Sequence, residues 1–406
     1  SVFCLSAAQI MLELHEYIYC KPAPLRTLLC NVLKVSEPFV GIGGMQELMA
    51  QCHCRYTSVN TYDIEPKYHD FHSRWGSTSG GDLASIGVFG PKGDVLQIDI
   101  HDLLDSSGLV AGCPCQPWAA NGLHHGRADE RSELFDLMVA WIVELSYRGL
   151  LLFVCLENSV RARHHMQIQQ KFLEVTVPFF EFDMMTVQLS ATLPHRRERL
   201  WLRGMRVDTL LGKPMPPPLW DLPKVKLVDL LQPDLENVDP TMLSTQKKRL
   251  SFWNYVKQIE THISSGQAER GATAVMELDR AHTSVFGIVL IFDMIPTIRV
   301  RGPDYFLLST EDLHLPWYRK RICRYLAENE RFALQGHPVE AFNAMSGKTI
   351  ARKATGNAYA VPMLAQVLLP MLNQIALSAV DIEKALSLEA LDMLVPRKML
   401  LSRESL

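Results

Sequence analysis

Short apolar segments alternate with longer mixed segments along the first half of the chain. The apolar segments that predict β-strands are residues 36–42, 57–62, 95–98, 108–111, 150–156, 182–189 and 200–203. Residues 133–148 carry apolar side chains at the three- and four-residue spacing of an amphipathic helix, namely Leu134, Leu137, Met138, Trp141 and Leu145. The alternation predicts an α/β fold with a mainly parallel sheet covered by helices. In such sheets ligands bind beyond the carboxyl ends of the strands.

The pattern breaks after Arg206. Residues 213–218 read Lys-Pro-Met-Pro-Pro-Pro, and further prolines follow at Pro223, Pro233 and Pro240, which predicts an irregular linker because proline interrupts helices. We therefore expect four parts in the chain. They are a helical extension over residues 1–35, a main domain over 36–205, a smaller domain over 206–320 with a β-rich end at 285–308, and a segment over 321–406 that returns to the main domain.

The composition is that of an ordinary globular protein, with 48% hydrophobic and 21% charged residues among 406. The longest apolar runs, 150–156 and 288–292, are far shorter than the roughly 18 residues that span a bilayer, so no membrane partner is expected. The chain begins at Ser1 without an initiator Met or a signal peptide, which is compatible with a fragment or an excised domain.

The nine cysteines are odd in number and irregularly spaced, which favours a reducing compartment over a disulfide framework. We therefore expect an intracellular protein, nuclear in a eukaryote and cytoplasmic in a bacterium. No Cys-x-x-Cys or His-Glu-x-x-His spacing is present, so no metal site is expected.

The net charge of −3 does not indicate nucleic-acid binding. Arginine and lysine are nevertheless clustered in two places: Arg196, Arg197, Arg199, Arg203 and Arg206, and then Arg319, Lys320, Arg321 and Arg324. Solvated faces and phosphate-binding faces both show such clusters, and the sequence leaves the two open.

Two segments carry candidate chemistry. A glycine-rich loop, 39–44, begins within the last residues of the first predicted strand, and its glycines permit close approach to a ligand. Asp63 follows the next strand about 20 residues later, the place at which a carboxylate binds ribose in nucleotide folds. Together they predict an adenosine-containing cofactor.

Cys115 lies between Pro114 and Pro117 at the end of an apolar run, where a rigidly held thiolate can serve as a nucleophile.

In their order along the chain, these motifs resemble the cytosine-5 DNA methyltransferase family over about residues 36–372. The resemblance is carried by the loop 39–44, Asp63, Asp94, Pro114-Cys115-Gln116, Glu157-Asn158, Arg197-Glu198-Arg199, residues 334–338 (Leu-Gln-Gly-His-Pro) and Gly356-Asn357-Ala358. It implies a Rossmann-like class I methyltransferase sheet with helices on both faces, and it makes the smaller domain a target-recognition domain.

The resemblance also implies S-adenosylmethionine as the cofactor. The residues expected to bind it are Phe39, Val40, Gly41, Ile42, Gly43, Gly44, Asp63, Ile64, Asp94, Val95, Pro114, Leu134, Asn357 and Ala358. Among these, Asp63 would hold the ribose, Asp94 the adenine amine, and Asn357 would close the site from the C-terminal segment.

For catalysis, the resemblance implies that Cys115 attacks carbon 6 of cytosine and that Glu157 contacts ring nitrogen 3. Arg199, with Arg197, would hold the target base and its phosphate. The expected partner is double-stranded DNA, and the residues expected to contact it are Gln116, Asn121, Arg197, Thr297 and Arg299. The base must leave the double helix to reach these groups, and residues 121–131 have the glycines and polarity of a loop that closes over DNA.

Four positions depart from the family pattern: Trp118, Ala119, Ser159 and His195. They leave two alternatives open beside an active DNA (cytosine-5) methyltransferase. One is a catalytically weak module that binds DNA or regulates a partner, and the other is an RNA cytosine-5 methyltransferase.

Overall fold

The computed structural model describes residues 33–52, 57–78, 93–118, 130–220, 222–279, 289–300, 302–311 and 313–387. The described chain forms two compact units. The large unit contains residues 33–187, 198–220 and 363–387, and the small unit contains residues 188–197 and 222–362. The predicted boundaries at 205 and 320 differ from these divisions because residues 188–197 and 321–362 belong to the small unit. The predicted extension over 1–35 lies almost entirely outside the described residues.

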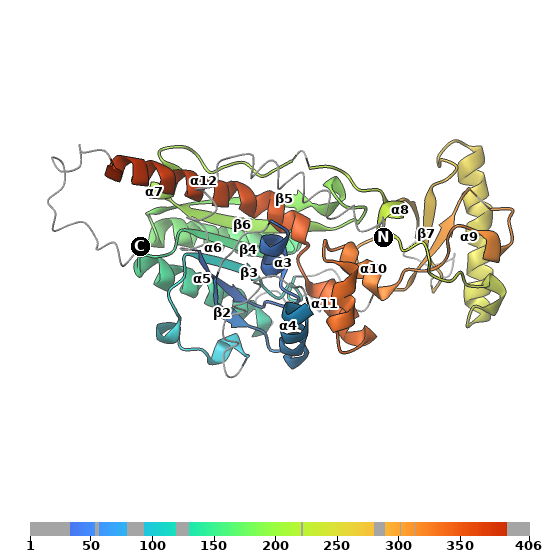
Figure 1. Cartoon of the computed structure of the whole chain (residues 1–406), viewed down its shortest axis with the longest axis horizontal. Coiled ribbons are helices and arrows are strands. Elements are labelled where there is room, and N and C mark those ends of the chain that lie inside the picture. Colours follow the sequence, from blue (N-terminus) through green and yellow to red (C-terminus); the bar gives the residue numbers. More distant parts are fainter. Residues whose placement is uncertain are drawn as a thin grey trace. The chain divides into compact units, whose positions relative to one another are not determined.

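A six-stranded sheet forms the centre of the large unit (Figure 1). Its strands are β1 (Lys34–Pro38), β2 (Thr57–Tyr62), β3 (Gly108–Gly112), β4 (Phe153–Asn158), β5 (Phe180–Gln188) and β6 (Glu198–Arg206), in the order β2-β1-β3-β4-β6-β5. β1 pairs in parallel with β2 and β3, β3 pairs in parallel with β4, and β6 is antiparallel to β4. The predicted mainly parallel α/β sheet is confirmed.

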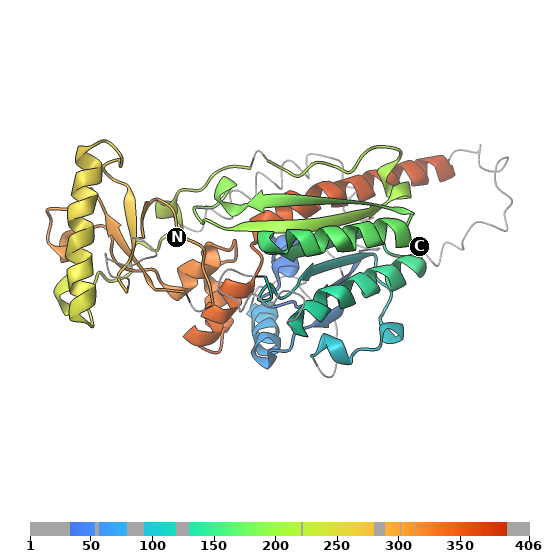
Figure 2. The same ribbon diagram turned by 180° about the vertical axis from the view of Figure 1, so that it is seen from behind.

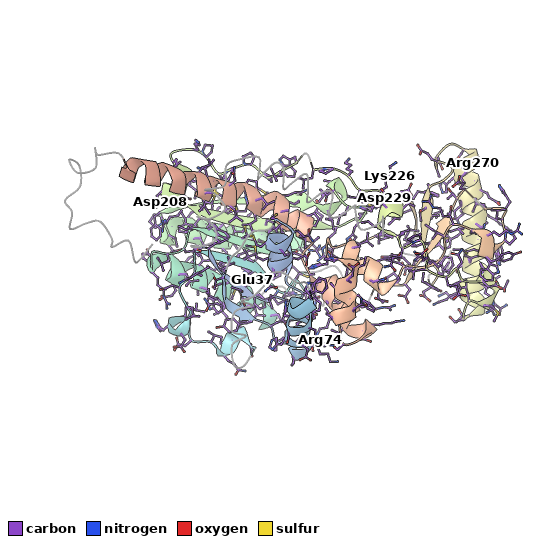
Figure 3. The ribbon with its side chains drawn as sticks, in the orientation of Figure 1. Glu37, Arg74, Asp208, Lys226, Asp229 and Arg270 are labelled. Atoms are coloured by element: carbon purple, nitrogen blue, oxygen red, sulfur yellow. The ribbon has the colours of Figure 1, made fainter. Side chains whose placement is uncertain are left out.

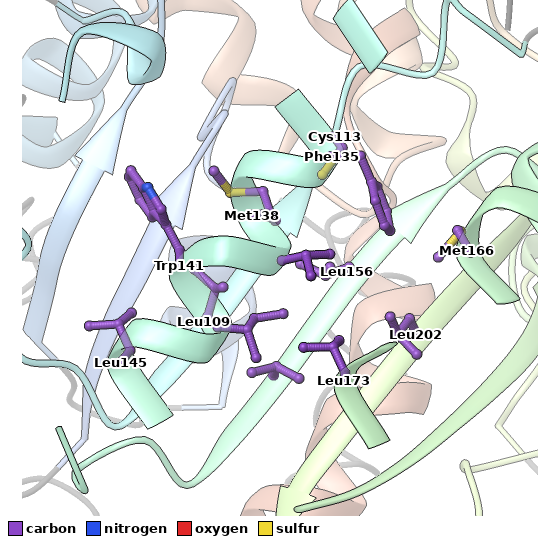
Figure 4. Packing of buried hydrophobic residues seen from close by; sticks show 14 of the residues in the cluster. Leu109, Cys113, Phe135, Met138, Trp141, Leu145, Leu156, Met166, Leu173 and Leu202 are labelled. Atoms are coloured by element: carbon purple, nitrogen blue, oxygen red, sulfur yellow. The ribbon is translucent and has the colours of Figure 1, made fainter. Parts of the chain in front are cut away.

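Helices lie on both faces of this sheet (Figures 1 and 2). The helices of the large unit are α3 (Gly44–Gln51), α4 (Pro66–Thr78), α5 (Glu133–Tyr147), α6 (Arg163–Thr176), α7 (Val207–Leu210) and most of α12 (Val361–Ser387). α12 covers one face, and α5 and α6 cover the other (Figure 2). Phe135, Met138 and Trp141 of α5 pack with Leu109 and Leu156 of the sheet in one buried cluster (Figure 4), which confirms the amphipathic helix read from residues 133–148.

Short 3-10 turns fill several connections: η1 (Val95–Gln97), η2 (Ile100–Asp102), η4 (Glu130–Ser132), η5 (Val160–Ala162), η6 (Leu189–Ala191), η7 (Pro240–Met242), η8 (Trp317–Arg319) and η9 (Val339–Ala344). The strand predicted over 95–98 is therefore wrong. The Asp94 side chain accepts a hydrogen bond from the Leu96 N–H and caps the turn, and such local bonding of Asp to the backbone competes with strand pairing.

The small unit contains a four-stranded antiparallel sheet in the order β10-β9-β7-β8. Its elements are α8 (Leu227–Leu230), α9 (Gln246–Ser264), β7 (Thr273–Glu277), β8 (Leu290–Phe292), β9 (Tyr305–Ser309), β10 (Cys323–Tyr325), α10 (Glu328–Ala333) and α11 (Lys348–Asn357). Phe252, Tyr255 and Ile259 on one face of α9 pack against β7 and β9. The β-rich end predicted at 285–308 is present as β8 and β9, and residues 280–288 lie outside the described part.

α12 is the one helix among the described residues that is long and apolar enough to cross a membrane. Within its apolar window, Val361–Ser378, 83% is buried inside the protein, which is the environment of a core helix.

Candidate active site and cofactor loop

The glycine-rich loop lies between β1 and α3. Phe39, Gly41 and Gly43 all have positive φ angles, of 60°, 53° and 71°, and Gly43 is also the residue that caps α3. Side chains are strained in this region of φ, and glycine is not. The loop therefore turns sharply at the carboxyl end of β1, and the first turn of α3 begins directly behind it.

Two side chains hold the Gly41 peptide from opposite sides. The Gly41 N–H donates to Asp63 Oδ2 at 2.9 Å, and His72 Nε2 donates to the Gly41 carbonyl at 2.9 Å. Burial lowers the pKa of His72 to about 4, so this imidazole is neutral near pH 7. Behind the loop, the buried Glu37 of β1, labelled in Figure 3, accepts hydrogen bonds from Ser58 Oγ of β2 at 3.2 Å and from Gln46 of α3 at 3.3 Å. The glycine loop is thus rigidly supported.

The acidic residues predicted to bind the cofactor lie around the ends of β1 and β2. Asp63 Oδ1 accepts the Glu65 N–H at 2.9 Å, and Oδ2 accepts the Gly41 N–H at 2.9 Å. Ile64 next to it is 73% exposed, which leaves an apolar side chain open to a flat ring. A Cβ on Gly93 would lie 2.6 Å from the Asp63 carbonyl oxygen, so the close approach at Gly93 brings Asp94 beside the end of β2.

Two other residues predicted to bind the cofactor, Val95 and Leu134, have side chains that are less accessible to a ligand. Val95 is buried in the large core, and Leu134 in the first turn of α5 packs against the same core. Pro114 belongs to the turn that follows β3.

Cys115 differs from every other cysteine that the structure describes. Cys52, Cys113, Cys155 and Cys323 are buried, whereas Cys115 is partly exposed, and all five are free thiols. Burial raises the pKa of Cys155 and of Cys323 to about 12, and burial with the nearby Glu157 carboxylate raises that of Cys113. Since the thiolate is the reactive form, these three buried thiols are inert, and Cys115 is the accessible candidate. Among the described residues, no group of three or more His, Cys, Asp or Glu could hold a metal ion.

An ion pair lies beside the strand that leads to Cys115. Glu157 near the end of β4 pairs in register with Gly112 at the end of β3. Arg199 at the start of the antiparallel β6 places its Nε 2.7 Å from Glu157 Oε1, with the side chains 13% and 5% exposed. The fold therefore brings Glu157 and Arg199 to the same edge of the sheet as the turn that carries Cys115.

Arg197 lies in the small unit and is 2% exposed. Its guanidinium donates to the carbonyl of Gly356 at 3.4 Å and to that of Ala358. These bonds tie Arg197 to the end of α11, which contains Asn357. The arrangement gives Arg197 a structural contact, and its contact with a target base stays a prediction.

His195, which departs from the family pattern, also joins parts of the small unit. Its Nε2 accepts the Ile298 N–H at 3.0 Å, and its Nδ1 donates to the Leu334 carbonyl at 3.1 Å. Thr297 Oγ1 donates to the Arg196 carbonyl. The segment that contains Thr297 and Arg299 is thereby attached to the arginine segment 195–197.

Of the other predicted DNA contacts, Gln116 lies in the Cys115 turn, and its Oε1 is buried without a hydrogen bond from the described residues. Asn121 and Ala119 lie outside the described residues, as does most of the predicted closing loop 121–131. Sequence reasoning missed His72, because nothing in its spacing from Gly41 signals the contact. It also missed the stacking of Trp118 on His165.

The sequence matches a known protein family. The profile of the C-5 cytosine-specific DNA methylase family matches residues 33–372. The type II methyltransferase M.HaeII of Haemophilus aegyptius is 24% identical over 308 residues, which are 74% of this chain and 85% of that protein. M.NlaX of Neisseria lactamica is 27% identical over 184 residues, which are 43% of this chain and 52%, about half, of that protein.

Solved structures show the same fold. The Entamoeba histolytica methyltransferase EhMeth superposes with a TM-score of 0.53 at 15% identity, covering 84% of this chain and 98% of its own. A putative DNA modification methyltransferase encoded within an E. coli prophage gives 0.51 at 16% identity, covering 87% and 99%. From the profile match over most of its length, the chain belongs to the C-5 cytosine-specific DNA methylase family.

Proposed function

We propose that this protein transfers the methyl group of S-adenosylmethionine to carbon 5 of cytosine in double-stranded DNA through a covalent bond to Cys115. The observation that carries the proposal is the accessible thiol of Cys115 at the end of β3, on the same edge of the sheet as the Glu157–Arg199 pair. Membership of the family indicates the class of reaction, and Cys115, Glu157 and Arg199 are the groups that we propose carry it out.

The cofactor loop suits S-adenosylmethionine. The Asp63 carboxylate beside the loop is the kind of group that accepts hydrogen bonds from ribose hydroxyls, and the exposed Ile64 next to it offers an apolar surface to adenine. Gly41 and Gly43 allow the backbone to approach the ligand closely. When bound, S-adenosylmethionine supplies an electrophilic methyl group on a sulfonium.

Cys115 solves the main chemical difficulty, which is that carbon 5 of cytosine is a poor nucleophile. Attack of its thiolate on carbon 6 converts the ring into an enamine whose carbon 5 can accept a methyl group, so that one hard step becomes two easier ones. A water molecule or hydroxide then takes the proton from carbon 5, and the electron pair of that bond re-forms the double bond between carbons 5 and 6 and expels the Cys115 thiolate.

Glu157 and Arg199 stabilise the attacked ring. In this proposal, the negative charge that develops on the ring during attack is relieved by a proton at nitrogen 3, which the Glu157 carboxyl would hold. Arg199 Nε lies 2.7 Å from Glu157 Oε1, which fixes the orientation of that carboxyl. Such fixed groups need no reorganisation when the charge appears.

Trapping with 5-fluorocytosine tests the reaction. Fluorine replaces the hydrogen that carbon 5 must lose before the thiolate is expelled, so the enzyme remains covalently bound to the base. With S-adenosylmethionine present, a random-sequence duplex DNA containing 5-fluorocytosine should yield an adduct that survives denaturant, and peptide mass spectrometry should place it on Cys115. A matched RNA pool should give none. Adduct on RNA alone would transfer the activity to RNA, and no adduct on either polymer would leave a non-catalytic binding module.

Cofactor affinity tests the glycine loop independently of methyl transfer. A Cβ on Gly43 would lie 1.7 Å from Gln46 Oε1 and 2.7 Å from the His72 ring at a φ of 71°, so Gly43→Ala should displace the loop. We expect the dissociation constant of S-adenosylmethionine, measured by calorimetry, to rise by about tenfold or more. Gly149→Ala is the matched control, because Gly149 has a φ of 84° and open space around it. Equal affinity in the two variants would contradict the assignment.

A further inference from the structure

An aromatic stack joins the Cys115 turn to α6. The backbone N–H of Trp118 donates to the backbone carbonyl of Cys115 at 3.1 Å and closes the turn. The Trp118 indole lies on the His165 imidazole, with ring centroids 5.1 Å apart and planes inclined by 22°. The residue that ends the turn is therefore attached to a helix on the face of the sheet.

His165 is itself fixed by α5. It is 5% exposed, and its Nε2 lies 3.3 Å from Asp136 Oδ1. The Phe135 ring meets the imidazole edge-on at 5.4 Å and belongs to the buried cluster in Figure 4. Gln169 Nε2 donates to the same Asp136 oxygen at 2.6 Å. The imidazole is thus held on its face, its edge and its nitrogen.

Burial of the His165 imidazole costs free energy because its ring nitrogens lose water, a cost that an apolar side chain of similar size does not carry. Core packing alone does not call for it. What the arrangement adds is a fixed orientation for Trp118, since aromatic stacking has a directional preference and the stacked imidazole is itself held between Phe135 and Asp136.

We propose that His165 and Trp118 form a positioning pair that fixes the Cys115 turn for attack on the target base. The inference rests on the proposed function, in which Cys115 is the nucleophile. The turn is held at its start by the buried Cys113 at the end of β3 and at its end by the stack on His165. A nucleophile held at both ends reacts faster than one that must be ordered first.

A double-mutant cycle measures the coupling. His165→Ala and Trp118→Ala should each lower the single-turnover rate of methyl transfer by roughly 10- to 100-fold, with the KM for DNA and for S-adenosylmethionine changed much less. The double variant should be no slower than either single variant, because each substitution already frees the turn. Trp118→Phe, which preserves an aromatic stack, should retain most of the rate.

The neighbouring His164 is exposed and provides the matched control. His164→Ala should react like the unaltered protein. Rates that multiply in the double variant, or a His165→Ala rate equal to that of His164→Ala, would overturn the proposal.

Alkylation of Cys115 in the free protein gives a readout that needs no methyl transfer. Peptide mass spectrometry after brief iodoacetamide treatment should show faster modification of Cys115 in His165→Ala and Trp118→Ala, with the buried Cys113 and Cys155 unchanged. Faster modification of all three would indicate general loosening and would contradict a positioning role. If this pattern holds while the unaltered protein forms no adduct on 5-fluorocytosine DNA, the positioning pair stands and the proposed function fails.

Discussion

Cys115→Ser should abolish methyl transfer to DNA while S-adenosylmethionine binds as before. The hydroxyl is a far weaker nucleophile than a thiolate at neutral pH, and no other accessible thiol lies among the described residues to replace it. We expect a loss on the order of 10⁴-fold or more in the single-turnover rate, measured by transfer of a tritiated methyl group. The adduct with 5-fluorocytosine DNA should disappear with it.

The control for this substitution is Cys323→Ala. Cys323 is buried in the core of the small unit, so its loss tests whether removing a thiol in general affects the protein. That variant should lose some stability and keep its adduct. Methyl transfer by Cys115→Ser within about tenfold of the unaltered rate would show that the nucleophile is another group, because nucleophilic residues account for much larger effects.

The parts of the site that the sequence predicted are those set by local motifs. The loop 39–44 turns where its glycines permit positive φ, and Cys115 lies three residues after Gly112, the last residue of β3. A short motif that connects a strand to a helix can occupy few positions in the fold, so its place at the carboxyl edge of the sheet follows from the topology. The prediction of a strand over 95–98 was wrong because the spacing of apolar residues gives no information about the hydrogen bond by which Asp94 caps the turn.

The parts that the sequence left open depend on particular side-chain partners in the folded protein. The two basic clusters were compatible with solvated or phosphate-binding faces, yet Arg203 and Arg324 are 1% and 4% exposed. Arg203 pairs with Asp183, and Arg324 pairs with Glu330. The hold of His72 on Gly41 spans 31 residues. Charge and spacing give no sign of such partners, because burial of a charge requires a particular tertiary neighbour.

Arg199→Ala should cost both stability and activity. It leaves the Glu157 carboxylate, whose side chain is 5% exposed, without the guanidinium 2.7 Å away, and removing one partner of a buried pair typically costs about 3–5 kcal/mol. Chemical unfolding should register a loss of this size. For comparison, Arg206→Ala removes a pair with the exposed Asp208, and its cost should be less than about 1 kcal/mol.

The double variant Arg199→Ala with Glu157→Gln separates the effect on stability from the effect on activity. A neutral amide needs no cation, so the double variant should recover part of the unfolding free energy that Arg199→Ala loses. Its methyl transfer should stay low, because an amide cannot hold the proton at ring nitrogen 3 as a carboxyl can. Recovery of the rate together with the stability would mean that Glu157 serves only the fold, and the chemistry at nitrogen 3 would then have to come from another residue.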